Sequence, residues 1–188
     1  MIKQGEEYSN SNKLNIVDLF CGCGGLSKGF EEAGYNILIG VDNDVDALNT
    51  FKFNHNGALA ANLDLSGNDF LSNLESSLNG KTVDIVLAGP PCQGFSLTGP
   101  RQLDDPRNSL YMAVFKTVSQ FSPKAFVIEN VFGLKTMWKG AVLKEIIEKF
   151  SNEIGYDVVS SLVNMAEYGV AQFRKRVFIV GINKELNK

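Results

Sequence analysis

The sequence predicts an α/β protein with a doubly wound, mostly parallel sheet and an antiparallel hairpin at one edge. Short apolar runs rich in strand-forming residues alternate along the chain with segments whose apolar residues recur at helical spacing. Parallel neighbours require crossover helices of this kind. The last two strand-like runs have no helical segment between them, so they are expected to pair with each other as the antiparallel hairpin.

Strands are predicted where mainly apolar or aromatic residues form a short run bounded by turn residues. In chain order these runs are 14–20, 37–41, 59–63, 83–88, 125–129, 156–164 and 177–182. Helices are predicted where apolar side chains repeat every three or four residues, as Val45, Leu48 and Phe51 do. The predicted helices span 26–33, 45–54, 70–78, 109–121 and 141–154. Because ligands bind beyond the carboxyl ends of the strands in such sheets, function is expected in the turns that follow them.

Composition indicates one globular domain, since the chain has 188 residues, 44% of them hydrophobic, and a net charge of −3. These values exclude charge-driven disorder and a uniformly basic nucleic-acid binder. Residues 1–133 hold 9 basic and 15 acidic groups and residues 134–188 hold 9 basic and 6 acidic, so the basic bias lies in the second segment. Residues 1–13 lack the apolar core of a signal peptide, and no run reaches the ~18 apolar residues of a membrane span. We therefore expect a cytoplasmic protein with no membrane partner.

The cysteines and the single histidine argue against a disulfide framework and against a metal centre. Cys21, Cys23 and Cys92 are odd in number and are expected to be reduced. With one histidine and no second cysteine pair, the chain has too few ligands for zinc, so no metal is expected. His55 is expected at the surface or at a helix end, and nothing in the sequence supports a histidine-based catalytic triad.

A glycine-rich turn, CGCGG at 21–25, follows the first predicted strand and precedes the first helix. Such a turn lets backbone approach a ligand closely, although similar turns also serve simply as connectors. Asp42 ends the second strand about twenty residues later, where an acidic residue can accept both hydroxyls of a ribose. A helix-capping or solvated aspartate is the alternative for Asp42. Together the two features favour a ligand that contains adenosine.

Cys92 lies between prolines and a glycine directly after a predicted buried strand, which suits a positioned nucleophile better than a core thiol. Glu129 ends the next strand at the same edge, where its carboxyl could face Cys92 across a small ligand or simply be solvated. The basic cluster at 172–176 opens the last strand, and alternation places Arg174 and Arg176 on one face. These arginines suit phosphate and base contacts, with a solvated strand edge as the alternative.

Seven segments resemble, in order, the motifs of cytosine-5 DNA methyltransferases of the bacterial restriction–modification type. They are DLFCGCGGLSKGF at 18–30, VDN at 41–43, NLDL at 62–65, PPCQGFS at 90–96, DPRNSL at 105–110, ENV at 129–131 and QFRKR at 172–176. The resemblance implies a Rossmann-like methyltransferase fold with S-adenosylmethionine as its cofactor. The residues that it implies for cofactor binding are Phe20, Gly22, Gly24, Asp42, Asn43, Asp64, Leu65, Pro91 and Leu110.

The resemblance also implies a catalytic set: Cys92 as nucleophile, Glu129 as its acid partner, and Arg174 and Arg176 as contacts to a cytosine flipped out of DNA. Carbon 5 of cytosine is too weak a nucleophile to take a methyl group unaided. The Cys92 thiolate would therefore add to carbon 6, while Glu129 stabilises the charge that develops on the ring. Flipping the base out of the duplex costs roughly a few kcal/mol.

Members of this family continue past the last of these motifs into a target-recognition region and two further motifs. The sequence therefore predicts a flexible segment over 1–13 and a methyltransferase catalytic domain over 14–188 without a recognition region. Double-stranded DNA would bind weakly, because phosphate neutralisation is slight. A second polypeptide would supply the recognition region and the remaining motifs. A truncated, inactive fragment that only folds and weakly binds cofactor, and an RNA cytosine-5 methyltransferase, are the alternatives.

Overall fold

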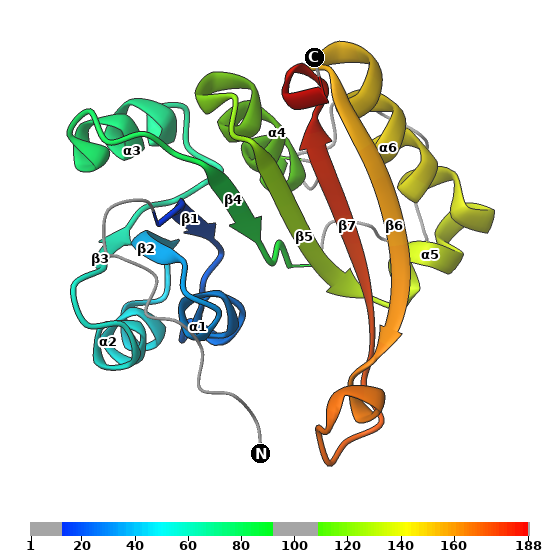
Figure 1. Cartoon of the computed structure of the whole chain (residues 1–188), viewed down its shortest axis with the longest axis horizontal. Coiled ribbons are helices and arrows are strands. Elements are labelled where there is room, and N and C mark those ends of the chain that lie inside the picture. Colours follow the sequence, from blue (N-terminus) through cyan, green and yellow to red (C-terminus); the bar gives the residue numbers. More distant parts are fainter. Residues whose placement is uncertain (1–12, 92–108, 188) are drawn as a thin grey trace.

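The structure, a computed structural model, describes residues 13–91 and 109–187 and contains a seven-stranded sheet in the order β3-β2-β1-β4-β5-β7-β6 (Figure 1). The strands are β1 Asn15–Leu19, β2 Asn36–Asp42, β3 Leu59–Asn62, β4 Ile85–Ala88, β5 Ala125–Val131, β6 Tyr156–Asn164 and β7 Lys175–Asn183. The α-helices are α1 Gly25–Glu32, α2 Val45–Asn54, α3 Phe70–Leu78, α4 Ser109–Phe121, α5 Gly133–Thr136 and α6 Ala141–Glu153.

The predicted class of sheet is confirmed. Because β1 to β5 are paired in parallel, their carboxyl ends lie at the same edge of the sheet. All pairings among β1 to β5 are parallel, whereas β7 is antiparallel to both of its neighbours, β5 and β6. The predicted hairpin of the last two strands is therefore present. Its second strand, β7, takes the inner position, and β6 forms the edge of the sheet.

Each predicted strand and helix is found, with differences of one or two residues at the ends of six strands and two helices. Three of the strands show a difference of two residues at one end. β4 begins at Ile85 rather than at Val83, and β5 continues to Val131, so that Glu129 lies inside the strand. β7 begins at Lys175, two residues before the predicted start. Four short helical segments were not predicted from the sequence, namely α5 Gly133–Thr136, η3 Met137–Gly140, η4 Met165–Tyr168 and η5 Lys184–Asn187.

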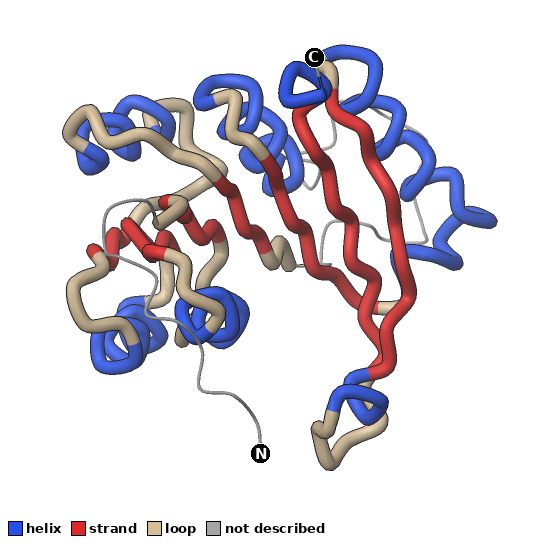
Figure 2. Tube along the Cα trace, viewed as in Figure 1, coloured by secondary structure: helices blue, strands red, loops and turns tan. Residues whose placement is uncertain are grey.

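Helices cover the two faces of the sheet, and alternate strand residues belong to separate cores (Figures 1 and 2). On one face Leu48 and Phe51 of α2 pack with Ile16 of β1. On the other face α3, α4 and α6 pack against neighbouring strand residues, including Val17. Burial on both sides explains why these strands read as continuous apolar runs.

The β6–β7 hairpin extends beyond the rest of the sheet, and its connecting loop projects from the molecule (Figure 1). Helix α6 packs against β6, and Val177 and Ile179 of β7 are buried in the same core. On the opposite face of the hairpin, Val159 is 67% exposed and Ile182 is 40% exposed. None of the helices in the described parts of the chain has the length and apolar character needed to cross a membrane.

Candidate active site at the carboxyl edge of the sheet

The glycine-rich turn joins β1 to α1 through a backbone that only glycine adopts easily. Gly22 has φ +53° and Gly24 has φ +86°, and the Gly24 N–H donates to the Cys21 carbonyl over 2.9 Å. A Cβ on Gly22 would meet no atom within 4 Å, whereas one on Gly24 would collide with the rings of His55 and Phe51. Gly22 therefore borders open space, where a ligand can approach the backbone. Glycine is required at position 24, because the rings of His55 and Phe51 fill the space that a side chain would occupy.

Phe20, directly after β1, has φ +56°, a value that bulky side chains rarely adopt. Such backbone strain persists only where the surrounding structure enforces it, and it is concentrated at functional sites. The strained backbone accompanies a Phe20 side chain that lines a hollow at the carboxyl ends of the strands.

The hollow gathers residues from four strand ends and from the start of α4. Its lining residues are Phe20, Asn43, Leu63, Asp64, Leu65, Pro91 and Leu110. Six of these seven were predicted as cofactor-binding residues, and Leu63, beside the predicted pair at 64–65, was missed. The hollow measures about 70 Å³, against the roughly 300 Å³ or more of a pocket that encloses a whole small ligand.

Asp42 ties the end of β2 to the glycine-rich turn. Its Oδ2 accepts the N–H of Gly22 over 2.8 Å, and its Oδ1 accepts the N–H of Asp44 over 3.0 Å. The neighbouring residue, Asn43, lines the hollow. Each carboxylate oxygen retains a further lone pair, so Asp42 can fix the turn and still accept from a ligand.

Asp64 is held by Ser66, whose hydroxyl and N–H donate to Asp64 Oδ1 over 2.6 and 2.9 Å. These bonds lower the pKa of Asp64, so the residue is an ionised acceptor at the rim of the hollow at neutral pH. Its neighbour Leu65 is buried and contributes an apolar wall.

Glu129 and Arg176 form an ion pair, with 2.7 Å between Glu129 Oε1 and Arg176 Nε. In the antiparallel register Val131 is opposite Arg176 and Glu129 is opposite Phe178, so the pair is diagonal on one face of the sheet. The Glu129 side chain is 29% exposed and that of Arg176 is 16% exposed, which leaves the carboxylate reachable.

Two details of the predicted catalytic set differ from the structure. Glu129 does not end its strand, because pairing with β7 extends β5 by two residues. Arg174 lies one residue before β7 and is exposed, so it is outside the strand that bears Arg176. Cys92 lies outside the described residues, and Pro91, the residue before it, lines the hollow.

Asn130 is a site residue that the sequence analysis missed. Its side chain is buried, its Nδ2 donates to the Pro90 carbonyl over 3.0 Å, and its Oδ1 accepts the N–H of Val131 over 2.8 Å. This contact links the end of β5 to the backbone two residues before Cys92. The available signal was its place beside Glu129 in the ENV segment.

The remaining sulfur and imidazole groups do not add to this edge. Cys21 is buried, and burial raises the pKa of its thiol, so it remains protonated and unreactive. Cys23 is exposed. Of the two positions predicted for His55, the helix end is confirmed, since His55 caps α2, and the residue is only 1% exposed because it fills the space behind Gly24.

An open, doubly wound sheet with a hollow at the carboxyl ends of its strands is the architecture of α/β proteins that bind ligands at the switch point of the sheet. The chain belongs to the C-5 cytosine-specific DNA methylase family, whose model matches residues 14–188.

Relatives in this family are named as Type II methyltransferases. M.DdeI of Desulfomicrobium norvegicum is 43% identical over 175 residues, which are 92% of this chain and 41% of the relative. M.AgeI of Thalassovita gelatinovora is 43% identical over 169 residues, covering 89% of this chain and 39% of the relative. The chain thus spans about two fifths of the length of these relatives. M.AquIA of Picosynechococcus is 37% identical, and the match covers 88% of this chain but 71% of that shorter relative.

Solved structures agree with the fold. A protein assigned as a DNA modification methyltransferase encoded within an E. coli prophage superposes with a TM-score of 0.76 at 33% identity, covering 93% of this chain and 48% of that one. The Dnmt2 methyltransferase of S. pombe superposes with a TM-score of 0.69 at 18% identity, covering 92% of this chain and 50% of that one. This second likeness supports the fold alone.

Proposed function

We propose that this chain is the catalytic part of a DNA (cytosine-5-)-methyltransferase, with Cys92 as its nucleophile and S-adenosylmethionine as its methyl donor. The observation that carries the proposal is the tie between Asn130 and Pro90. This hydrogen bond joins Pro90 to the strand that bears Glu129, which supports a nucleophile at Cys92 near that carboxylate. A nucleophile and a carboxylate that can face one flipped base are what methylation of cytosine carbon 5 requires.

The pocket residues fit the proposed cofactor. Gly22 borders open space and has a positive φ, so its backbone can approach a ligand as closely as a methionine moiety requires. Asp42 has lone pairs for ribose hydroxyls. Phe20 and Leu65 supply apolar surfaces for an adenine, with Asp64 as an acceptor at the rim. When bound there, S-adenosylmethionine supplies an electrophilic methyl group.

In the proposed reaction the Cys92 thiolate forms a bond to cytosine carbon 6, and the electron pair displaced from the 5,6 double bond makes carbon 5 nucleophilic. Glu129 hydrogen-bonds to ring N3 and the exocyclic amine and stabilises the charge that develops on the ring, while Arg176 holds the Glu129 carboxyl group and the O2 edge of the base. Carbon 5 would then take the methyl group as the methyl carbon–sulfur bond of the sulfonium breaks and its electron pair stays on the departing sulfur. A base removes the carbon-5 proton, and that electron pair restores the double bond as the Cys92 sulfur leaves.

The substrate and partners are proposed on the same basis. Double-stranded DNA is the substrate class, and target recognition requires residues outside the sequence described here, in the same polypeptide or in a second one. The proposed location is the cytoplasm. The proposed domain is 14–188, after a flexible segment over 1–13.

The test combines tritiated S-adenosylmethionine with mixed-sequence DNA that contains 5-fluorocytosine, which traps the covalent adduct. The chain is assayed alone and with the polypeptide encoded immediately downstream. We expect a covalent protein–DNA complex that wild-type protein forms and Cys92→Ser does not. Cys23→Ser is the matched control, since Cys23 is an exposed thiol outside the proposed reaction, and this variant should trap like wild type.

Other outcomes would redirect the proposal. Trapping by Cys92→Ser would remove Cys92 from its role. Methylation of transfer RNA in place of DNA would favour the RNA cytosine-5 alternative. Cofactor binding with no trapping on either nucleic acid, with or without the downstream polypeptide, would indicate a fragment that only folds and binds cofactor.

A further inference from the structure

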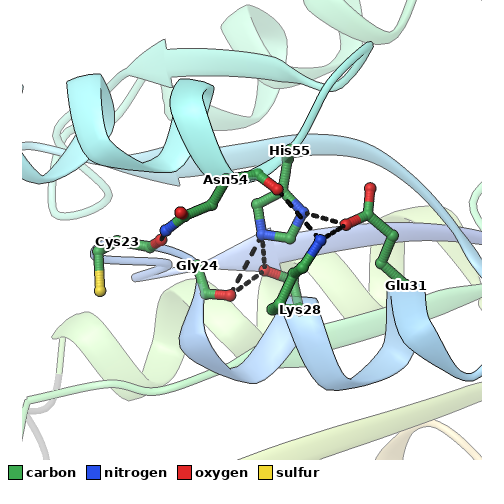
Figure 3. A network of polar contacts seen from close by, with 7 residues as sticks. Cys23, Gly24, Lys28, Glu31, Asn54 and His55 are labelled. Carbon is green, nitrogen blue, oxygen red and sulfur yellow. Dashed lines mark hydrogen bonds and ion pairs between the residues drawn. The ribbon is translucent and has the colours of Figure 1, made fainter.

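Two consecutive residues at the end of α2 hold the glycine-rich turn from behind (Figure 3). Asn54 Nδ2 donates to the Cys23 carbonyl over 2.8 Å. His55 Nε2 lies 3.2 Å from the Gly24 carbonyl oxygen. Two successive carbonyls of the turn are therefore held by two successive side chains of another helix, about thirty residues away in sequence.

The imidazole of His55 is fully enclosed by the elements that it joins. Its ring centroid is 4.4 Å from that of Phe51, and Nε2 is also 3.2 Å from Ser27 Oγ. When Nε2 carries a proton it donates to the Gly24 carbonyl, and when it does not it accepts from the Ser27 hydroxyl. In both states the ring is hydrogen-bonded to the start of α1.

Contacts on the other side of the ring connect the same two helices. Nδ1 of His55 lies 3.2 Å from Glu31 Oε2, an ion-pair distance that lacks hydrogen-bond geometry. Lys28 Nζ donates to Glu31 Oε2 over 2.7 Å and to the Asn54 carbonyl over 3.3 Å. As Figure 3 shows, Lys28 and Glu31 of α1 thus contact Asn54 and His55 at the end of α2.

Ser27, His55 and Glu31 are the residue types of a hydrolytic triad, but burial rules out that role here. Ser27 is 0% exposed and His55 is 1% exposed, so no substrate can reach the serine oxygen. The hydrogen bonds that this buried polar network makes to backbone carbonyls instead fix the geometry of the turn.

The network contacts the glycine-rich turn at 21–25 on the side away from the open space at Gly22, where the cofactor is proposed to bind. Gly24, the N-cap of α1, has a positive φ, and the His55 ring occupies the space where a side chain on residue 24 would lie. Removing the ring would take away one of three contacts to the Gly24 carbonyl, which also accepts the N–H of Lys28 over 2.9 Å and the hydroxyl of Ser27 over 3.3 Å, and it would open a void directly behind the turn.

We propose that His55, assisted by Asn54, is a positioning residue that holds the turn at 21–25 in the conformation that receives the cofactor. This inference rests on the proposed function, because it concerns the same cofactor site. The network acts on affinity for the cofactor through the backbone of the turn and touches no reacting atom.

The first test measures binding of S-adenosylmethionine by calorimetry, well below the unfolding temperature of each variant. His55→Leu fills the same space with an apolar side chain but lacks the Nε2 group that contacts the Gly24 carbonyl. We expect its Kd for S-adenosylmethionine to rise about tenfold, as the loss of one buried hydrogen bond predicts. His55→Gln presents an amide near the position of Nε2, so its Kd should stay within about threefold of wild type. Phe150→Leu is the control for lost core packing, because Phe150 is equally buried but lies in the other core. Its Kd should not change.

The second test needs no cofactor. Amide hydrogen exchange of residues 22–27 should accelerate about tenfold or more in His55→Leu, and less in Asn54→Ala, with wild-type exchange retained in β5 and α6. Asn73→Ala, an exposed asparagine on α3, is the control for Asn54→Ala.

Unchanged exchange in the turn, or an equal loss of affinity in Phe150→Leu, would overturn the inference and leave the proposed function intact. If wild-type protein binds no S-adenosylmethionine, the proposed cofactor fails, and hydrogen exchange still decides whether His55 holds the turn.

Discussion

The two halves of the sheet are built differently. In the half formed by β3, β2, β1 and β4, the strands have four to seven residues, and helices cover both faces. In the half formed by β5, β7 and β6, the strands have seven to nine residues, and the face away from α6 carries exposed side chains such as Val159. Side chains anchor the turns of the first half, whereas the Glu129–Arg176 pair stands on the open strand face of the second.

Under the proposed function, this difference separates two tasks of one active site. Binding a cofactor through backbone groups requires turns that do not move, and a double cover of helices with buried polar contacts supplies that rigidity. Receiving a bulky nucleic-acid base requires an open face with a few charged groups on a firm support. Long antiparallel strands provide that support without a helix above them. The predictions below test whether the two halves can be disturbed separately.

The largest expected effect concerns Asp18 in the first half. Burial raises the pKa of Asp18 to about 7 from 3.8, and its Oδ2 has no hydrogen-bond partner within the described residues. The native state therefore keeps a proton that the unfolded state releases near pH 4. The stabilisation is fully present below that pH and is lost as pH rises through about 7, a change of up to about 4 kcal/mol.

Asp18→Asn should remove this pH dependence. Urea unfolding at pH 4, 6 and 8 should show wild type losing stability relative to the variant as pH rises, with Asp18→Asn more stable at pH 8. Parallel pH profiles for the two proteins would contradict the raised pKa.

In the second half, Glu129→Gln should lower the rate of covalent trapping on 5-fluorocytosine DNA by about 10²–10³-fold, the usual loss for a group that stabilises developing charge. Cofactor affinity and thermal stability should stay close to wild type, because the side chain is partly exposed and lies outside the hollow. Glu148→Gln on α6 is the matched control, as an exposed glutamate paired only with Lys144. Equal rates for Glu129→Gln and wild type would remove Glu129 from the mechanism.

Two strand glycines allow the same substitution in both halves. A Cβ on Gly40 of β2 would collide with Phe51 and Cys21, and one on Gly181 of β7 would collide with Phe126. Each alanine variant should lose about 1–3 kcal/mol of stability through overpacking. Gly40→Ala should also weaken cofactor binding, because Cys21 is the first residue of the glycine-rich turn and Phe51 packs behind Gly24. Calorimetry that shows an equal loss of affinity in Gly181→Ala would mean that the halves are coupled.

A smaller effect is expected where the halves meet. Asn130→Asp keeps the acceptor for the N–H of Val131 but loses the donor to the Pro90 carbonyl. We expect trapping to slow about tenfold, the cost of one hydrogen bond, with cofactor affinity unchanged. Asn36→Asp, an exposed change at the start of β2, is the control in the same trapping assay. A trapping rate equal to that of the control would show that the Pro90 tie does not act on Cys92.

The strands and helices were predictable because local periodicity and turn residues set them, and so was the gathering of the Phe20, Asn43 and Asp64 segments at one edge. The insertion of β7 between β5 and β6 was not predictable, since an alternating pattern of apolar residues indicates a strand but not the strand with which it pairs. The burial of His55 depends on Gly24 and Ser27, which lie about thirty residues earlier in the chain. Asn130 was missed because its contact with Pro90 spans forty residues.

The position of β7 also sets the order in which the sheet can be completed during synthesis. β6 emerges from the ribosome before β7, yet β7 is the strand that joins β6 to β5. Until residues 175–183 are available, β5 presents an unpaired row of N–H and carbonyl groups. A nascent chain that pauses before residue 175 therefore exposes a template for pairing with another molecule, and rapid closure of the β6–β7 hairpin protects the protein from aggregation.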